Sequence, residues 1–152
     1  MKALTLTQPW ATLVAIGAKQ IETRSWNTSY RGRLAIHAAK GWPASAKKIC
    51  FKEPFLSALV DAGFFTQLDN LPRGAIVAVC DLVHVKKIDE LTPFPACSAF
   101  ARRKGLWKLN GREQVFGDYS IGRFMWLLDN VVMLPKPVPA KGALSLWEWG
   151  GM

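Results

Sequence analysis

The sequence predicts an α+β fold, a mixed β-barrel of about six strands with two or three flanking helices. Two observations lead to this prediction: strand patterns recur along the whole chain, and most consecutive strands lack an intervening helix that would cross over the sheet. A length of 152 residues favours one domain over residues 1–152. Since 50% of the residues are hydrophobic and only 20% are charged, disorder is excluded as the main state.

The N-terminal residues predict a strand followed by a short helix. Residues 2–7 alternate with period two, which is typical of a strand. Pro9 is tolerated in a first helical turn, and Thr7 is available as the helix cap. We expect the helix to stop at Gly17, because glycine readily takes the left-handed conformation that closes many helices.

Two strands and a divided helix are predicted next. Residues 18–26 form a polar, strand-like stretch, and after a reversal residues 33–38 form the third strand. A second helical segment spans residues 43–63 and ends at Gly63. Pro54 interrupts this segment and divides it into two pieces, because proline cannot continue a helix.

The second half of the chain predicts three more strands. Residues 75–85 are apolar on both alternating faces, as in a strand that is buried on both sides. Residues 89–114 are basic and rich in turn formers, which predicts an excursion from the core with one helical turn. Residues 123–134 form a strand, prolines 135, 137 and 139 force an extended link, and residues 143–149 close the sheet.

The charge of the chain indicates an anionic partner. Lys and Arg number 20 against 11 Asp and Glu, and residues 1–48 hold eight basic residues with a single acid, Glu22. The chain is therefore predicted to bind an anionic partner. A second basic cluster either extends an electrostatic track for a polyanion or is a solvated loop; it comprises Arg102, Arg103, Lys104, Lys108 and Arg112.

Neither a membrane span nor a secretory leader is predicted. The longest uncharged run, residues 3–18, contains Gln8, Pro9 and three threonines, so it is neither a signal-peptide core nor a transmembrane segment. We therefore expect a cytoplasmic protein without a membrane partner, and we favour a monomer. There is no internal repeat and no low-complexity segment.

The cysteines and histidines predict neither a disulfide framework nor a metal site. Cys50, Cys80 and Cys97 are odd in number and far apart, so they are interpreted as reduced, mostly buried thiols. His37 and His84 lie on predicted strands among small or apolar residues, where a hydrogen-bonded core histidine is several times more common than a ligand. No metal or other cofactor is therefore predicted.

A ligand cleft is predicted around the second strand. Glu22, Arg24 and Trp26 project to one face of this strand, and Lys19, nearer the turn, is free to swing toward the same side. A guanidinium can bind a phosphate through two parallel hydrogen bonds, and an indole can stack on a base. Trp42 is a second candidate for stacking. The alternative is a solvated strand face with a surface ion pair of about 0–1 kcal/mol.

Asp81 is a charged residue within an apolar strand. A buried, unpaired carboxylate costs several kcal/mol, so we expect Asp81 to be nearly inaccessible and to pair with Lys19 or Arg24. Such a pair at the base of a pocket has the form of a catalytic acid–base site. The alternative is a bulge or a strand end that lets Asp81 reach water or a backbone amide.

Several runs of residues carry a resemblance to a known family: residues 8–10 (Gln-Pro-Trp), 17–24 and 31–38 near the N-terminus, then the strand ending in Asp81, and residues 117–123 and 139–142. The most specific part is the pattern Gly-x-Lys-x-x-Glu-x-Arg at Gly17, Lys19, Glu22 and Arg24. Together these runs resemble the ASCH domain, which is related to the PUA domains of RNA-modifying proteins. The resemblance covers nearly the whole chain.

The resemblance implies a PUA-like β-barrel with a helix-flanked cleft that binds RNA or a nucleotide, in a protein of RNA metabolism or regulation. The residues that match the family's Lys, Glu and Arg would line this cleft. With the residues singled out above, the predicted ligand-binding set is Lys19, Glu22, Arg24, Trp26, Arg31, His37 and Arg123.

Other activities within this family remain open as alternatives. Some small relatives are metal-independent amidohydrolases that act on N4-acetylcytidine with a lysine, a threonine three residues later and an acid on a later strand. Lys19 matches the lysine and Asp81 resembles the later acid, while Thr23 is displaced by one position because Glu22 stands three residues after Lys19. These three are the catalytic residues of the hydrolase hypothesis. A ribonuclease and an interaction module similar to a transcription coregulator are further alternatives.

Overall fold

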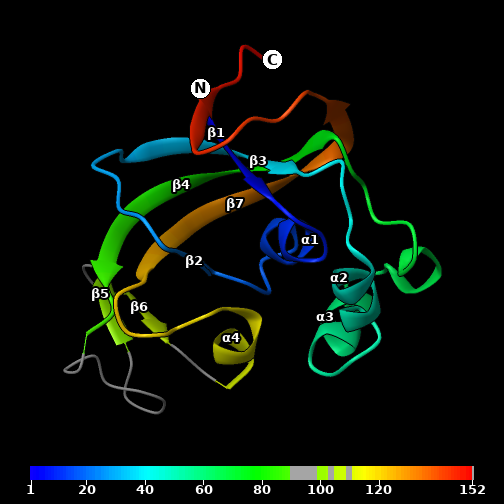
Figure 1. The fold of residues 1–152 in the computed structure, drawn as a ribbon, viewed down its shortest axis with the longest axis horizontal. Coiled ribbons are helices and arrows are strands. Elements are labelled where there is room, and N and C mark those ends of the chain that lie inside the picture. The colour runs from blue at the N-terminus through cyan, green and yellow to red at the C-terminus, as the bar shows by residue number, and fades with distance from the viewer. Residues whose placement is uncertain (90–98, 103–104, 109–110, 152) are drawn as a thin grey trace.

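The computed structural model describes residues 1–89, 99–102, 105–108 and 111–151, and between residues 99 and 108 it describes the backbone alone. The strands of the main sheet follow in the predicted order (Figure 1). The elements are β1 (Lys2–Leu6), α1 (Trp10–Ala15), β2 (Ile21–Arg24), β3 (Gly32–Ala38), α2 (Ala44–Ile49), α3 (Phe55–Asp61), the 3-10 turn η1 (Phe65–Gln67), β4 (Ala75–Lys87), β5 (Ala99–Arg102), β6 (Gly105–Lys108), α4 (Gly111–Phe116), β7 (Phe124–Pro139) and β8 (Leu146–Glu148).

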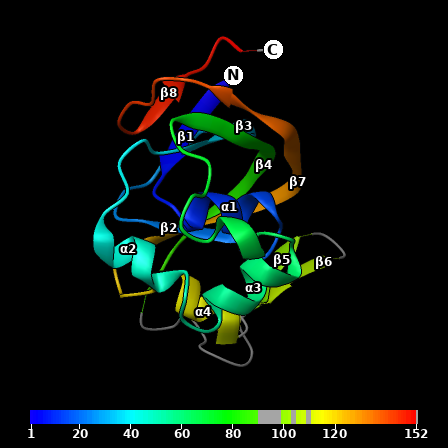
Figure 2. The ribbon, with the colours of Figure 1, turned by 90° about the vertical axis from the view of Figure 1, so that its right-hand side faces the viewer.

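Six strands form one curled sheet in the order β2-β7-β4-β3-β1-β8. Strands β1 and β3 run parallel, and the other neighbouring pairs are antiparallel. The long strands β4 and β7 shift register at three places, and such irregularities bend and twist a strand pair. The sheet therefore curls part of the way into a barrel, which confirms the predicted α+β fold (Figure 1, Figure 2).

Helix α1 packs against the sheet on one face and against α3 on the other. Ala11 and Val14 are fully buried in a cluster with side chains of β1, β3, β4 and β7. Leu13, on the opposite face of the same helix, joins Phe55 of α3 and Phe116 of α4 in a second buried cluster. This arrangement places the start of α1 between the sheet and the α3–α4 side of the molecule (Figure 1).

The ends of α1 show one expected and one unexpected feature. Gly17 has a φ of +79°, which matches its predicted role at the end of the helix. The Thr12 N–H is capped by the side chain of Gln8, whose Oε1 accepts its hydrogen bond at 3.0 Å. The predicted cap by the Thr7 side chain is therefore wrong; Thr7 supplies its backbone carbonyl to the Ala11 N–H.

Prolines act largely as predicted in the rest of the chain. Pro54 precedes α3 and separates it from α2, which confirms the division of the helical segment. The prolines after Leu134 do not form a separate link, because β7 continues through them to Pro139. Proline favours an extended conformation of the residue before it, so it is compatible with a strand here.

The predicted excursion, residues 89–114, contains the backbone of the β5–β6 hairpin and most of α4. Two residues of the second basic cluster, Arg103 and Lys104, lie outside the described residues, as does Cys97; of the side chains in this cluster only that of Arg112 is described. Cys50 and Cys80 are buried free thiols. Within the described ranges no helix is long and apolar enough to cross a membrane.

Candidate functional site

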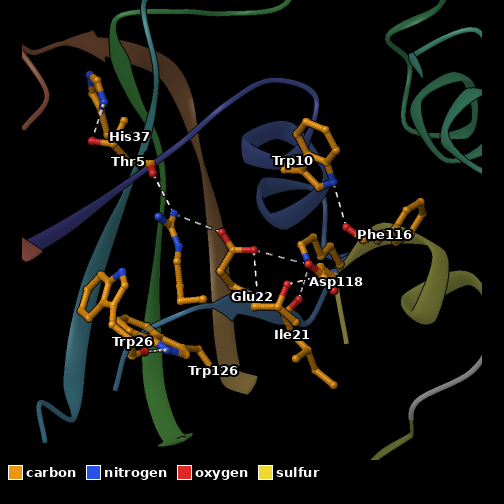
Figure 3. A network of polar contacts seen from close by, with 12 residues as sticks. Thr5, Trp10, Ile21, Glu22, Trp26, His37, Phe116, Asp118 and Trp126 are labelled. Carbon is orange, nitrogen blue, oxygen red and sulfur yellow. Dashed lines mark hydrogen bonds and ion pairs between the residues drawn. The ribbon is translucent and has the colours of Figure 1, made fainter. Parts of the chain in front are cut away.

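A cleft of about 530 Å³ opens beside β2. Its walls come from residues 5–7 at the end of β1, residues 22–26 of β2 and the following turn, and residues 115–118 at the end of α4. Trp10 of α1, Ile49 of α2, Phe55 of α3 and Arg123 before β7 complete the lining. Figure 3 shows this region, with Glu22 between the strands and the segment that contains Phe116 and Asp118.

Glu22 and Arg24 form a fixed ion pair on the floor of the cleft. Glu22 is 8% exposed, and its Oε2 lies 3.1 Å from Nη2 of Arg24. The same Nη2 donates to the Thr5 carbonyl at 2.8 Å, while Oε1 of Glu22 accepts the Thr23 N–H at 3.0 Å. Nε of Arg24 is buried and has no hydrogen-bond partner within the described residues. A donor and an acceptor are therefore held side by side at this floor.

Lys19 lies behind this pair and does not line the cleft. Its side chain is fully buried, its Nζ donates a hydrogen bond to the Ile21 carbonyl, and Oε1 of Glu22 is 3.6 Å away. A buried ammonium requires such partners, because an unpaired charge in the interior is costly. The structure thus gives Lys19 a contact with Glu22 and no direct access to a ligand.

Glu113 of α4 is a buried carboxylate that the sequence did not reveal. Its Oε1 and Oε2 accept the N–H groups of Ile21 and Gln20 at 3.1 Å and 3.0 Å. Burial raises the pKa of Glu113, and the positive charge of Lys19 opposes this effect. Glu113 therefore attaches α4 to the start of β2, which sets the position of the cleft wall that follows α4.

Three hydrogen bonds fix that wall to α1 and β2. The Trp10 indole N–H donates to the Phe116 carbonyl at 2.8 Å, and Oγ1 of Thr23 accepts the Asp118 N–H at 3.1 Å. Arg123 donates to the Thr23 carbonyl at 3.2 Å. A Cβ at Gly117 would lie 3.2 Å from Oγ1 of Thr23, so the close approach of this segment favours glycine. The wall of the cleft is preorganised by these contacts.

Comparison with known proteins assigns the family. The family model described as the ASCH domain matches residues 4–117, about three quarters of the chain. The chain belongs to the ASCH domain family. Activating signal cointegrator 1 of Mus musculus is 49% identical to this ASCH chain over 81 residues, which are 53% of the chain and 13% of that protein. Activating signal cointegrator 1 of Homo sapiens is 49% identical over 41 residues, 27% of the chain and 7% of that protein.

The ASCH chain therefore spans only a small part of the length of these relatives. The matched residues include most of β1, all of β2 to β6 and the four helices α1 to α4, and they run to Gly117 in the cleft wall. The curled sheet with its flanking helices agrees with the PUA-like barrel that the sequence resemblance implied.

The two tryptophans predicted to stack occupy different places in the ASCH domain. Trp26 lines the cleft, and its ring packs edge-to-face on the buried Trp126 with ring centroids 4.8 Å apart. Trp42 lies outside the cleft, where Lys47 and Arg73 each lie over its ring, 5.4 and 5.5 Å from the centroid. Of the two indoles, only that of Trp26 is placed to contact a ligand in the cleft.

Arg31 and His37 lie outside the cleft of the ASCH domain, whereas Arg123 is part of it. Arg31 is exposed and donates to nearby backbone carbonyls in its own turn. His37 is 2% exposed, with one ring nitrogen 3.2 Å from Oγ1 of Thr5 and the other 2.9 Å from the Ala140 carbonyl oxygen. In the described part of the chain no three His, Cys, Asp or Glu side chains gather as a metal site.

The predicted pairing of Asp81 with Lys19 or Arg24 is wrong. The Asp81 side chain is 25% exposed, and its Oδ1 lies 3.2 Å from Nη1 of Arg33. The side-chain amide of Asn130 donates a second hydrogen bond to this carboxylate, to Oδ2 of Asp81, at 2.9 Å. The register of the sheet places Arg33 directly opposite Asp81, and a register shift between β4 and β7 lies just before Asp81. These features match the alternative prediction, an irregular strand that lets the carboxylate reach solvent.

Proposed function

We propose that this cleft binds one nucleotide of a single-stranded RNA. The observation that supports the proposal is the fixed pair of Glu22 and Arg24 on the cleft floor. The edge of a base presents hydrogen-bond donors beside acceptors, and a carboxylate accepts from an exocyclic amine while a guanidinium donates to a ring nitrogen or carbonyl. Buried Nε of Arg24, which has no partner within the described residues, is an additional donor for such an edge.

The shape of the cleft supports a single extruded nucleotide. A volume of about 530 Å³ lies within the range of roughly 300–1,000 Å³ that is typical of small-molecule sites. RNA is read in single strands by hydrogen bonds to unstacked bases and by stacking on aromatic side chains. Trp26, at the lining of the cleft, supplies an aromatic surface of this kind.

Charge supports an anionic strand rather than a neutral ligand. The chain carries a formal net charge of +9, and Arg123, 29% exposed, lies at the cleft, where it pairs with the exposed Asp118 at 3.5 Å and a phosphate would compete for the same guanidinium. Lysine and arginine contacts to phosphates supply most of the sequence-independent affinity of nucleic-acid-binding proteins. We therefore assign base recognition to Glu22 and Arg24 and a phosphate contact to Arg123.

The hydrolase hypothesis has less support. Lys19, Thr23 and Asp81 would have to act on one substrate, but Lys19 is enclosed behind Glu22 and Asp81 pairs with Arg33 on the neighbouring strand. Only Thr23 lines the cleft, and its Oγ1 already accepts the Asp118 N–H. Nothing in this geometry favours an acyl transfer over binding.

Titration of an eight-nucleotide single-stranded RNA, followed by fluorescence anisotropy, tests the proposal. Arg24→Lys keeps the charge and removes Nε and the planar fork, so we expect affinity to fall by about 1–3 kcal/mol, roughly 5- to 150-fold. The matched control is Arg33→Lys, because Arg33 is exposed and lies outside the cleft. Wild-type protein that binds no RNA at low salt, or an Arg24→Lys variant that binds like Arg33→Lys, would contradict the proposal.

A further inference from the structure

A second pocket, of about 990 Å³, lies beside Thr5 near the end of β1 and is formed mainly by three separate segments. Residues 37–40 end β3, residues 73–74 precede β4, and residues 139–144 follow the end of β7. Backbone hydrogen bonds join these segments: the Gly74 N–H donates to the Ala38 carbonyl at 2.8 Å, and the Ala140 N–H donates to the Gly74 carbonyl at 3.0 Å. The pocket is thus part of the ordered sheet.

Each of the three segments contributes one cation. Lys40, Arg73 and Lys141 all line the pocket and are exposed, and its lining contains no Asp or Glu. Within the described residues none of these three cations forms a salt bridge. Three cations that line one pocket without a carboxylate beside them give it a positive potential, which favours an anion.

The floor of the second pocket is rigid. His37, which lines it, uses both ring nitrogens in hydrogen bonds, one to Thr5 and one to the Ala140 carbonyl. A Cβ at Gly142 would lie 2.5 Å from Cε1 of His37, so the backbone of residues 139–144 approaches the floor as closely as glycine allows. The cations therefore surround a fixed surface.

Thr5 connects the second pocket with the cleft, because it lines both. Its carbonyl accepts the hydrogen bond from Arg24 of the cleft at 2.8 Å, and its Oγ1 is 3.2 Å from Nδ1 of His37 in the second pocket. Figure 3 shows Thr5 between Glu22 and His37. The two pockets are therefore separated by one residue of β1.

We propose that the second pocket binds a phosphate group of the RNA strand, next to the nucleotide held in the cleft. The claim that this phosphate belongs to the RNA strand rests on the proposed function. The claim that the pocket prefers an anion rests on Lys40, Arg73 and Lys141 alone. A guanidinium binds phosphate oxygens in a two-pronged fashion and an ammonium binds them as a point charge, so this set fits a phosphodiester or a free phosphate.

The experiment measures affinity for the eight-nucleotide RNA over a series of salt concentrations. Each phosphate contact on a single strand contributes about 0.7 to the slope of log K against log salt, which is about fivefold in affinity at 0.1 M salt. We expect Arg73→Ala and Lys141→Ala each to weaken binding by about this factor and to lower the slope by about 0.7. Lys52→Ala, at an exposed lysine outside both pockets, is the matched control.

Four outcomes are distinguishable. If Arg73→Ala and Lys141→Ala bind like Lys52→Ala while Arg24→Lys is weaker, the second site is wrong and the proposed function stands. If the two pocket variants are weaker and Arg24→Lys is not, the phosphate site stands and the nucleotide cleft is wrong.

The other two outcomes concern free phosphate. Amide resonances of Gly74 and Gly142, followed during titration with inorganic phosphate, report on the pocket directly. Shifts at both glycines without RNA binding would identify free phosphate as the occupant and overturn the strand as its source. Neither shifts nor RNA binding would overturn both proposals.

Discussion

Glu113 joins two parts of the chain that are far apart in sequence, and its replacement by alanine tests whether this joint stabilises the fold. Its carboxylate is 4% exposed and accepts the N–H groups of Gln20 and Ile21. The Ile21 N–H is buried, and a buried donor left without an acceptor costs about 1–3 kcal/mol, so Glu113→Ala should lower the free energy of unfolding by roughly 1–3 kcal/mol. Domains are stable by only about 5–15 kcal/mol, which makes this a large loss.

Urea denaturation followed by tryptophan fluorescence measures this loss. The matched control is Glu148→Ala, which removes the same side chain from the surface, where it is 67% exposed and pairs with Lys2. A fully solvated ion pair contributes little to stability, so the control should change the free energy of unfolding little. If Glu113→Ala loses no more stability than Glu148→Ala, the attachment of α4 through this carboxylate does not stabilise the fold.

The pH dependence provides a second test of the same group. Burial raises the pKa of Glu113 above its ordinary value of 4.5, so the folded protein keeps this proton to higher pH than the unfolded chain. The resulting stabilisation is fully present below about pH 4.5 and is lost as the pH rises through the raised pKa. Glu113→Gln cannot titrate, so wild type should lose stability relative to this variant over that range. A constant difference would contradict the assignment.

Three further predictions follow from single contacts. Asp81→Ala should cost only about 0–1 kcal/mol in urea denaturation, because Asp81 and Arg33 are both partly exposed; a loss of several kcal/mol would indicate a buried pair. Burial raises the pKa of Cys80 to about 12 and of Cys50 to about 11, so site-resolved mass spectrometry should find both thiols unmodified by iodoacetamide at pH 8 until urea unfolds the chain. Because Lys19 is enclosed, N4-acetylcytidine should not be deacetylated, and turnover in a chromatographic assay would restore the hydrolase hypothesis.

The local features of this fold were predictable from the sequence because they depend on neighbouring residues. The run of apolar residues from Ala75 predicts a strand that is buried on both faces, and the structure buries residues 75–80 of β4. Pro54 predicts a break between two helices, since a proline ring excludes a continuous helix. Alternation along β2 also predicts that Glu22, Arg24 and Trp26 share one face; all three line the cleft, together with Thr23 and Ser25 between them.

The remaining features depend on register between distant segments, which the sequence does not state. Asp81 pairs with Arg33 because the β3–β4 register places them opposite each other, 48 positions apart. Glu113 contacts Ile21 across 92 positions, and nothing near Glu113 in the sequence marks it as buried. Lys40, Arg73 and Lys141 likewise line one pocket only because the fold brings three segments that are distant in sequence together.

The sequence pattern Gly-x-Lys-x-x-Glu-x-Arg combines two structural tasks that residue types alone do not separate. Glu22 must remain a fixed acceptor on the floor of a cleft, and a carboxylate so nearly buried is costly without cations nearby. Arg24 compensates it from the cleft side at 3.1 Å, and Lys19 compensates it from the interior at 3.6 Å. Lys19 reaches the interior because it precedes β2, where the strand's strict alternation does not yet apply. Within this motif Glu22 and Arg24 therefore line the cleft, while Lys19 lies behind them and holds the Glu22 carboxylate in place.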